Sequence, residues 1–216
     1  MVALVVITGV VFSMMSQSTK ASESFAALKD YKLTKAVNAT VDPAQGSGIV
    51  LNPGSKTQID IWEDPQCPYC RMFEESNGNY VDDLIRTKKV TAVFHVLSFE
   101  GEESVRAANA EFCAADEGRY LDMHKAVYLL QPKLGNSGFY SNANLIKIGG
   151  YIGLKSKRFT DCINKANKFD IVKANYDSMA KYKVTGTPTV FINGKLWQAK
   201  SASYDNNEFR LAVEAG

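Results

Sequence analysis

The hydrophobic residues of this 216-residue chain change their spacing twice along the sequence. Between residues 49 and 97 they form short alternating or continuous apolar runs, which are typical of β-strands. From Glu102 to about Lys183 they recur at helical spacing instead. A strand pattern returns at residues 189–198. Two parts of the chain that lie far apart in sequence are therefore expected to complete one sheet, with a block of helices between them.

Turn residues divide these regions into individual elements. We expect strands at residues 49–51, 57–62, 90–97, 189–192 and 195–198, and, besides the helices that follow Glu102, helices at residues 70–88, 143–152, 156–166, 169–182 and 205–213. The order β-β-α-β, a helical block, then α-β-β-α is that of an α/β thioredoxin fold with an inserted helical domain. Residues 48–98 and 183–216 are expected to form the thioredoxin domain, and residues 99–182 the helical insertion.

The first residues of the chain are similar to an export signal. The run from Val2 to Met15 is uncharged and apolar, but it is shorter than the roughly 20 residues that span a bilayer. It suits the apolar part of a signal peptide, although no basic region precedes it. We expect residues 1–15 to be a signal or membrane-anchor segment and the polar residues 16–47 to be a tether with one short helix near residues 23–31. A buried N-terminal strand or helix is the alternative.

The composition argues against several classes of function. An apolar fraction of 45% and an aromatic fraction of 11% are those of a folded globular protein. The formal net charge is only +2 and the basic residues are scattered, so no nucleic-acid partner is expected. The two histidines, His95 and His124, have no ligand-like neighbours in the sequence and are interpreted as ordinary packed or surface residues. Neither a metal site nor a cofactor is expected.

Two of the four cysteines form the motif Cys67-Pro68-Tyr69-Cys70 between a predicted strand and a predicted helix. In the first turn of that helix, unpaired backbone N–H groups and the positive end of the helix dipole would stabilise a Cys67 thiolate. Pro68 suits this turn because its missing N–H has no helical partner there. Cys70, one turn later, can close a disulfide with Cys67. A zinc knuckle also uses this spacing, but the position between strand and helix favours redox chemistry.

A second motif, Thr187-Pro188, directly precedes the last predicted hairpin. Alone it indicates an ordinary turn with a trans proline, since most X–Pro bonds are trans. In a chain that also carries CPYC, a Thr-Pro step leading into an apolar strand indicates a second part of the same site.

Together, the runs Asp64 to Cys70 and Gly186 to Gly194 resemble the DsbA-like thioredoxin family of bacteria. Within that family the chain is similar to the membrane-tethered oxidases of Gram-positive and actinobacterial species. The resemblance covers about residues 48–216 and includes the helical insertion.

The resemblance implies roles for several residues. Pro188 should be cis and lie against the active-site disulfide, as a catalytic residue beside the two cysteines. Thr187 should offer its backbone to an extended substrate by short β-augmentation, with Pro68 and Tyr69 completing the substrate-binding surface. Some actinobacterial members carry a second disulfide in the insertion, which implies a structural bridge between Cys113 and Cys162. Two buried free thiols are the alternative.

The sequence departs from the family at one position. A buried acid that is thought to assist proton transfer to the resolving thiol usually lies six positions before the first cysteine, where this chain has Ile61. Strand alternation turns Asp60 to the opposite face. Glu63 and Asp64, in the loop before CPYC, remain as candidates for proton transfer through water.

We therefore expect a monomeric, extracytoplasmic oxidase of the bacterial cell envelope, either membrane-tethered or secreted, that donates its disulfide to reduced exported proteins. The resemblance assigns its reoxidation to a quinone-linked membrane partner of the DsbB or VKOR type. A disulfide isomerase or reductase is the enzymatic alternative, although residues 16–47 are too short for the dimerisation domain of DsbC and DsbG isomerases. A redox-inert chaperone-like module is the alternative of a different class, and the intact CPYC motif argues against it.

Overall fold

The structure, a computed structural model, describes residues 25–200 and 203–216. Its strands are β1 (Ala39–Asp42), β2 (Gly48–Leu51), β3 (Thr57–Glu63), β4 (Val90–Val96), β5 (Thr189–Ile192) and β6 (Lys195–Trp197). Its α-helices are α2 (Pro68–Phe73), α3 (Asn79–Arg86), α4 (Glu102–Ala115), α5 (Tyr120–Leu129), α6 (Asn142–Tyr151), α7 (Lys157–Asn164), α8 (Phe169–Asp177) and α9 (Asn206–Ala215). Shorter helical turns are η1 (Phe25–Leu28), η2 (Pro43–Gln45), η3 (Glu74–Gly78) and η4 (Ser178–Ala180).

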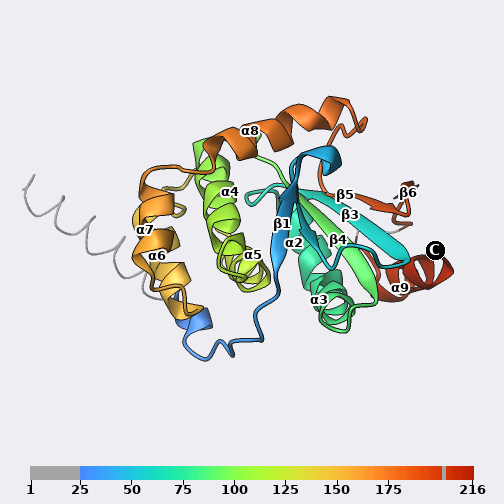
Figure 1. Ribbon diagram of the computed structural model, residues 1–216, viewed down its shortest axis with the longest axis horizontal. Coiled ribbons are helices and arrows are strands. Elements are labelled where there is room, and N and C mark those ends of the chain that lie inside the picture. Colours follow the sequence, from blue (N-terminus) through green and yellow to red (C-terminus); the bar gives the residue numbers. More distant parts are fainter. Residues whose placement is uncertain (1–24, 201–202) are drawn as a thin grey trace, which may run out of the picture.

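The strands form one six-stranded sheet in the order β1-β2-β4-β3-β5-β6. β3 and β4 run parallel, and the other neighbouring pairs are antiparallel. β5 pairs with β3, with Thr189 opposite Trp62, so the two distant parts of the sequence meet within the sheet. This arrangement confirms the predicted α/β thioredoxin fold with a helical insertion, whose helices α4 to α7 lie beside the sheet (Figure 1).

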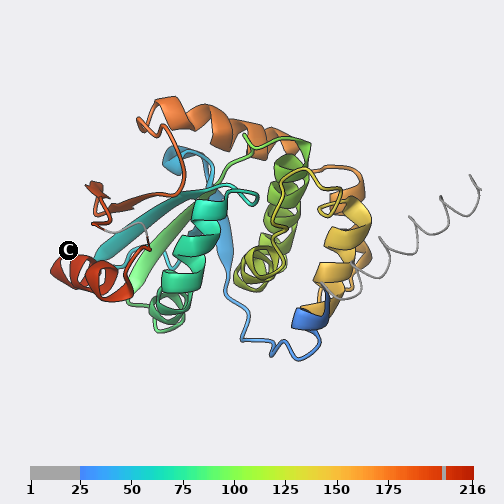
Figure 2. The same cartoon turned by 180° about the vertical axis from the view of Figure 1, so that it is seen from behind.

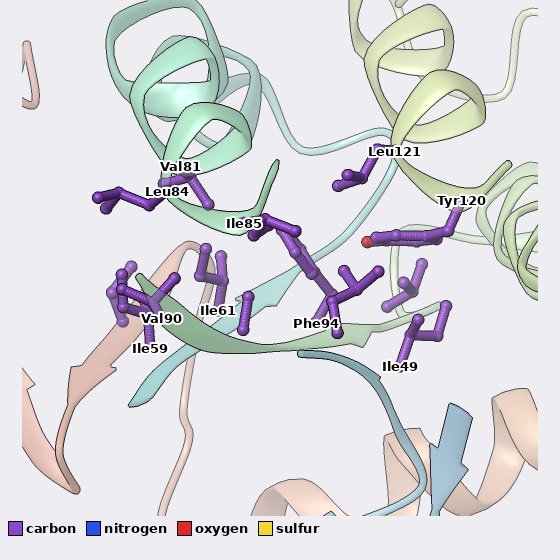
Figure 3. Packing of buried hydrophobic residues seen from close by; sticks show 14 of the residues in the cluster. Ile49, Ile59, Ile61, Val81, Leu84, Ile85, Val90, Phe94, Tyr120 and Leu121 are labelled. Atoms are coloured by element: carbon purple, nitrogen blue, oxygen red, sulfur yellow. The ribbon is translucent and has the colours of Figure 1, made fainter. Parts of the chain in front are cut away.

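One face of the sheet carries the larger hydrophobic core. Ile59 and Ile61 of β3 and Phe94 of β4 point toward α3 and α5 (Figure 3). There they pack with Ile85 and Tyr120, and each of these five side chains is at most 2% exposed. Full burial of such an aliphatic or Phe side chain contributes about 1.5–3 kcal/mol. α3 and α9 lie on this side of the sheet, and α8 lies on the other (Figures 1 and 2).

The opposite face is packed around aromatic rings. The rings of Trp62 and His95 stack with their centroids 3.6 Å apart. Asn175 of α8 lies 3.3 Å from His95 Nδ1 and donates to the backbone carbonyl of Val96. His95 is therefore a packed residue that joins α8 to the sheet.

The helical insertion has a core of its own. Buried residues of the insertion, including Met123, Tyr140 and Phe159, belong to a separate hydrophobic cluster. Within it a disulfide joins Cys113 of α4 to Cys162 of α7, with their Cα atoms 6.0 Å apart. The cysteines are separated by 49 residues in sequence, and closing a loop of that length stabilises the fold by about 4 kcal/mol in the chain-entropy treatment.

Residues 25–47 do not form the free tether that their polar sequence suggested. Phe25 and Leu28 of η1 are each 1% exposed and belong to the core of the insertion, where Phe25 stacks on Phe139. The chain then crosses to the sheet and adds β1 at its edge (Figure 1). This segment is fixed by a few buried side chains and one short edge strand. So few buried residues give no clear periodic pattern in the sequence. The predicted signal or anchor segment, residues 1–15, lies outside the described residues.

No helix in residues 25–200 and 203–216 is long and apolar enough to cross a membrane.

Candidate active site

The CPYC motif occupies the junction between β3 and α2. Cys67 caps the N-terminus of α2 with an extended backbone, and Pro68 takes the first helical position. Cys67 is 3% exposed and Cys70 is fully buried, and both are free thiols. Tyr69 is 57% exposed, so the dipeptide between the cysteines faces solvent.

The two thiols differ strongly in acidity. A hydrogen bond from the Cys70 thiol lowers the pKa of Cys67 to about 6; burial opposes this shift, while the backbone N–H groups of Cys70 and Tyr69 support it. Burial raises the pKa of Cys70 well above its ordinary value, and the hydrogen bond to Cys67 and the charge of Glu63 act in the same direction. At neutral pH the reduced pair therefore carries its negative charge on Cys67.

The Thr187–Pro188 step lies directly beside this pair. Its peptide bond is cis, and the Cys67 sulfur lies 3.5 Å from the carbonyl oxygen of Thr187. Pairing between β3 and β5 brings the two motifs together, since Trp62 and Thr189 are partners in the sheet. Pro188 also borders a groove of about 510 Å³ whose lining includes Trp197 and Tyr204. A surface of this kind can accept an extended peptide next to the reactive sulfur.

The helical insertion holds the loop before the motif. The Tyr128 hydroxyl donates to the carbonyl oxygen of Asp64 at 3.1 Å. The side-chain amide of Gln131 donates to the carbonyl oxygens of Pro65 at 2.9 Å and of Cys67 at 3.0 Å. Tyr128 also forms a small buried cluster with the two active-site cysteines. The sequence carries no signal for these contacts, because 64 or more positions separate the partners.

Asp64 acts as a connector between loops. Its carboxylate accepts hydrogen bonds from the backbone N–H groups of Gln66, Phe99 and Glu100 and from the Ser104 hydroxyl, at 2.6–3.1 Å. Burial raises its pKa to about 6, and the hydrogen bonds limit that rise. Both carboxylate oxygens are thus already bonded to the protein.

Glu63 differs from Asp64 in both position and bonding. It is the last residue of β3, whereas the sequence analysis placed it in the loop, because the strand runs one residue further than its apolar pattern indicates. It is 2% exposed, and neither of its carboxylate oxygens has a hydrogen-bond partner within the described residues. Burial raises its pKa to about 8, and the neighbouring charge of Glu74 adds to the rise.

The sequence analysis did not indicate the acidic surroundings of His124. The residue is packed, as expected, against the rings of Phe94, Tyr120 and Tyr128, but it also lies among buried acidic side chains. Its Nδ1 lies 2.9 Å from Glu111, and its Nε2 lies 3.3 Å from Glu63 and 3.5 Å from Glu74. These residues come from four elements, β3, η3, α4 and α5, so no local motif could have indicated the cluster.

Comparison with known proteins identifies the family. The family model described as "Thioredoxin" matches residues 45–213, which is most of the chain. The chain belongs to the thioredoxin family.

Solved structures of thiol–disulfide oxidoreductases share this thioredoxin-family fold. The disulfide bond oxidoreductase DsbG of Mycobacterium tuberculosis is 26% identical, with a TM-score of 0.65 over 76% of this chain and 81% of that one. DsbA of the same organism, in its reduced form, is also 26% identical, with a TM-score of 0.60 over 76% of this chain and 93% of that one. MdbA of Corynebacterium matruchotii, 22% identical, has a TM-score of 0.69 over 87% and 98% of the two chains and supports the fold alone.

Among curated proteins, the thioredoxin-family chain matches part of a larger one. The serine/threonine-protein kinase PknE of Mycobacterium tuberculosis is 24% identical over 164 residues. The match covers 66% of this chain but only 29% of the length of PknE.

Proposed function

We propose that this chain is a thiol–disulfide oxidoreductase that acts as an oxidase and donates a Cys67–Cys70 disulfide to substrate proteins. The observation that carries the proposal is the difference in acidity between the two thiols. The lowered pKa of Cys67 means that its thiolate is stabilised in the reduced form. Because this stabilisation favours the dithiol state over the disulfide, the disulfide is a ready electron acceptor.

The reaction follows from the positions of the sulfurs. A substrate thiolate attacks the Cys67 sulfur, the Cys67–Cys70 bond breaks, and its electron pair leaves on Cys70, which takes up a proton. A second substrate thiolate then attacks the substrate sulfur of the mixed disulfide and releases Cys67 as a stabilised thiolate. The substrate loses two electrons and gains a disulfide, while the chain becomes a dithiol.

We assign the proton transfer at Cys70 to Glu63 and not to Asp64. Glu63 is buried, and its negative charge acts on Cys70. Its carboxylate oxygens have no hydrogen-bond partner in the described part of the chain, whereas those of Asp64 bind backbone amides and a hydroxyl. Asp64 is instead a positioning residue for the loop before Cys67.

The substrate is proposed to bind in the groove beside Pro188. The Thr187 carbonyl lies next to the Cys67 sulfur, so an extended substrate paired with residue 187 would carry its own sulfur to the point of attack. Pro68 and Tyr69 are both exposed and are proposed to complete the substrate-binding surface.

An extracytoplasmic location, tethered or secreted, and reduced exported proteins as substrates complete the proposal. The structural disulfide between Cys113 and Cys162 supports it, because such bridges persist in oxidising compartments. Reoxidation is assigned to a quinone-linked membrane partner of the DsbB or VKOR type.

Oxidative refolding separates an oxidase from the other activities. A reduced model protein is mixed with stoichiometric oxidised chain, and a scrambled-disulfide substrate is mixed with the reduced chain in parallel. We expect rapid disulfide formation in the first assay and slow recovery of the correctly paired substrate in the second. The Cys67→Ser variant should show no activity in either assay. Efficient unscrambling without oxidation would instead assign the chain as an isomerase.

A further inference from the structure

The proposed oxidase reaction uses one member of the buried cluster around His124 and leaves the others without a role. The side chains of Glu63, Glu111 and His124 are at most 5% exposed, and that of Glu74 is 11% exposed. Burying several carboxylates together is costly unless a positive charge compensates them. The cluster therefore needs a physical explanation of its own.

Three donor atoms of the cluster converge on one point. His124 Nε2, a Glu63 oxygen and a Glu74 oxygen all lie within 4.8 Å of one another. The Nε2 atom is 3.3 Å from Glu63 Oε2 and 3.5 Å from Glu74 Oε2, yet it forms no hydrogen bond within the described residues. Donor atoms bound to one tetrahedral ion at about 2.0–2.1 Å lie roughly 3.3 Å from each other. The two distances from Nε2 are thus close to the spacing of ligands at a metal site.

Glu111 fixes the orientation of the imidazole. Its carboxylate lies 2.9 Å from His124 Nδ1, and the Tyr120 hydroxyl lies 3.1 Å from the same nitrogen. A carboxylate at Nδ1 keeps a proton on that nitrogen and leaves the Nε2 lone pair for a ligand bond. This carboxylate–histidine arrangement is the usual support of a metal-binding histidine.

The surrounding charges leave the cluster negative. Three carboxylates face a single imidazole. The basic side chains that line the adjoining cavity are engaged elsewhere, because Arg71 pairs with Glu75 and Lys125 donates to Asn79. A divalent cation at Nε2 would supply the missing positive charge.

A cavity connects this point with the surface. It has a volume of about 170 Å³ and is lined by Glu74 and His124 together with Tyr128 and Leu129. Leu129 is 48% exposed, so the cavity gives an entry path and room for a water as a fourth ligand.

The π-helical turn η3 determines where the carboxylate of Glu74 lies. η3 widens the helix between Glu74 and Gly78, and such turns are frequent at functional sites. The Glu74 carboxylate lies against Gly78, where a Cβ atom would overlap its Oε2. A side chain at position 78 would therefore displace this oxygen.

We propose that Glu63, Glu74 and His124 bind a divalent transition-metal ion, with Glu111 as the positioning residue for His124. One imidazole and two carboxylates match Zn²⁺ best, and the open fourth position faces the cavity. A cation at this site and a proton on Glu63 exclude one another.

The test uses the full chain with Cys67 and Cys70 oxidised, so that their thiols cannot bind metal. After treatment with a chelator, Zn²⁺ is titrated by calorimetry and Co²⁺ by visible absorption. We expect one equivalent of each ion to bind, and the Co²⁺ spectrum to lack the intense thiolate charge-transfer band. Binding should be lost in Glu74→Gln and unchanged in Glu75→Gln, the exposed neighbour. Absence of binding to the wild-type chain, or equal binding by Glu74→Gln, would overturn the proposal.

Gly78→Ala gives a second test that keeps every donor atom. Gly78 has helical dihedrals, φ −57° and ψ −39°, so alanine fits the backbone. The melting temperature should be maintained while Zn²⁺ affinity falls by at least about tenfold, as for other changes in the support of a metal site. Unchanged affinity in a folded Gly78→Ala chain would also contradict the proposal. Neither outcome depends on whether the chain acts as an oxidase.

Discussion

The sulfur of Cys67 lies 3.5 Å from the carbonyl oxygen of Thr187, although 120 positions separate the two residues. The sheet makes this contact possible, because only residues 64–66 separate β3 from CPYC and β5 begins directly after Pro188. The helical insertion between them does not separate the two motifs. Instead its residues Tyr128 and Gln131 hold the loop that precedes Cys67.

Cys67, and not Cys70, should form the mixed disulfide with substrate. Cys67 caps the N-terminus of α2 beside the Thr187 carbonyl, whereas Cys70 is fully buried three residues later. Cys70→Ser should accumulate covalent substrate adducts at Cys67, detected on non-reducing gels and assigned by mass spectrometry. Equal adduct yield from Cys67→Ser through Cys70 would reverse the assignment.

The reactivity of Cys67 should follow its lowered pKa. Its alkylation rate in the reduced protein should rise through a midpoint near pH 6, not near the ordinary value of 9.0. Because folding lowers this pKa, ionisation of Cys67 stabilises the folded reduced chain. The contribution is complete at pH values above the pKa of Cys67 in the unfolded chain, and it is lost as the pH falls through about 6.

The same shift should appear in thermal stability. The melting temperature of the reduced form, relative to the oxidised form, should be higher at about pH 8 than at about pH 5. A difference that does not change with pH would contradict the account.

Gln131 should stabilise the active-site loop. Gln131→Ala removes two hydrogen bonds to buried carbonyl groups, so the free energy of unfolding should fall by about 1–3 kcal/mol. Urea denaturation measures this loss, with Gln45→Ala in η2 as the control. An effect no larger than that of the control would show that the loop holds its position without Gln131.

The bridge between Cys113 and Cys162 should contribute to stability and not to turnover. Replacing both residues with Ala should lower the free energy of unfolding by up to about 4 kcal/mol and leave oxidase activity at moderate temperature intact. Mild reduction should open Cys67–Cys70 first, because Cys113 and Cys162 lack a leaving group of low pKa. Mass spectrometry after alkylation without reduction checks the bridge, and alkylated Cys113 and Cys162 in freshly isolated protein would exclude it.

The fold was predictable because the buried residues of most of its elements recur at regular spacing in the sequence. An alternating run marked β3, a continuous apolar run marked β4, helical spacing marked α4, and Asn193-Gly194 marked the hairpin of β5 and β6. β1 was missed because it is a four-residue edge strand with mostly half-buried residues. The helix after CPYC begins at Pro68, two residues before the predicted range 70–88, and the π-helical turn η3 lies within that range.

The candidate site was predictable only where its chemistry is local in sequence. CPYC and the Thr187-Pro188 step are contiguous motifs, so residue order alone indicated them. The cluster around His124 depends on contacts between four elements, which no spacing along the chain reveals. Glu63 and Asp64 are adjacent acidic residues in the sequence, and only their positions and hydrogen bonds in the structure distinguish them.

The equilibrium reduction potential of the Cys67–Cys70 pair tests the central claim most directly. It is measured by equilibrating the chain with glutathione buffers of defined ratio and quantifying the dithiol fraction after acid quenching. Stabilisation of the Cys67 thiolate should give the pair an oxidising reduction potential. We expect a value well above the about −270 mV of thioredoxin and closer to the about −120 mV of a strong oxidase. A value at or below about −270 mV would contradict the account and assign the chain as a reductase.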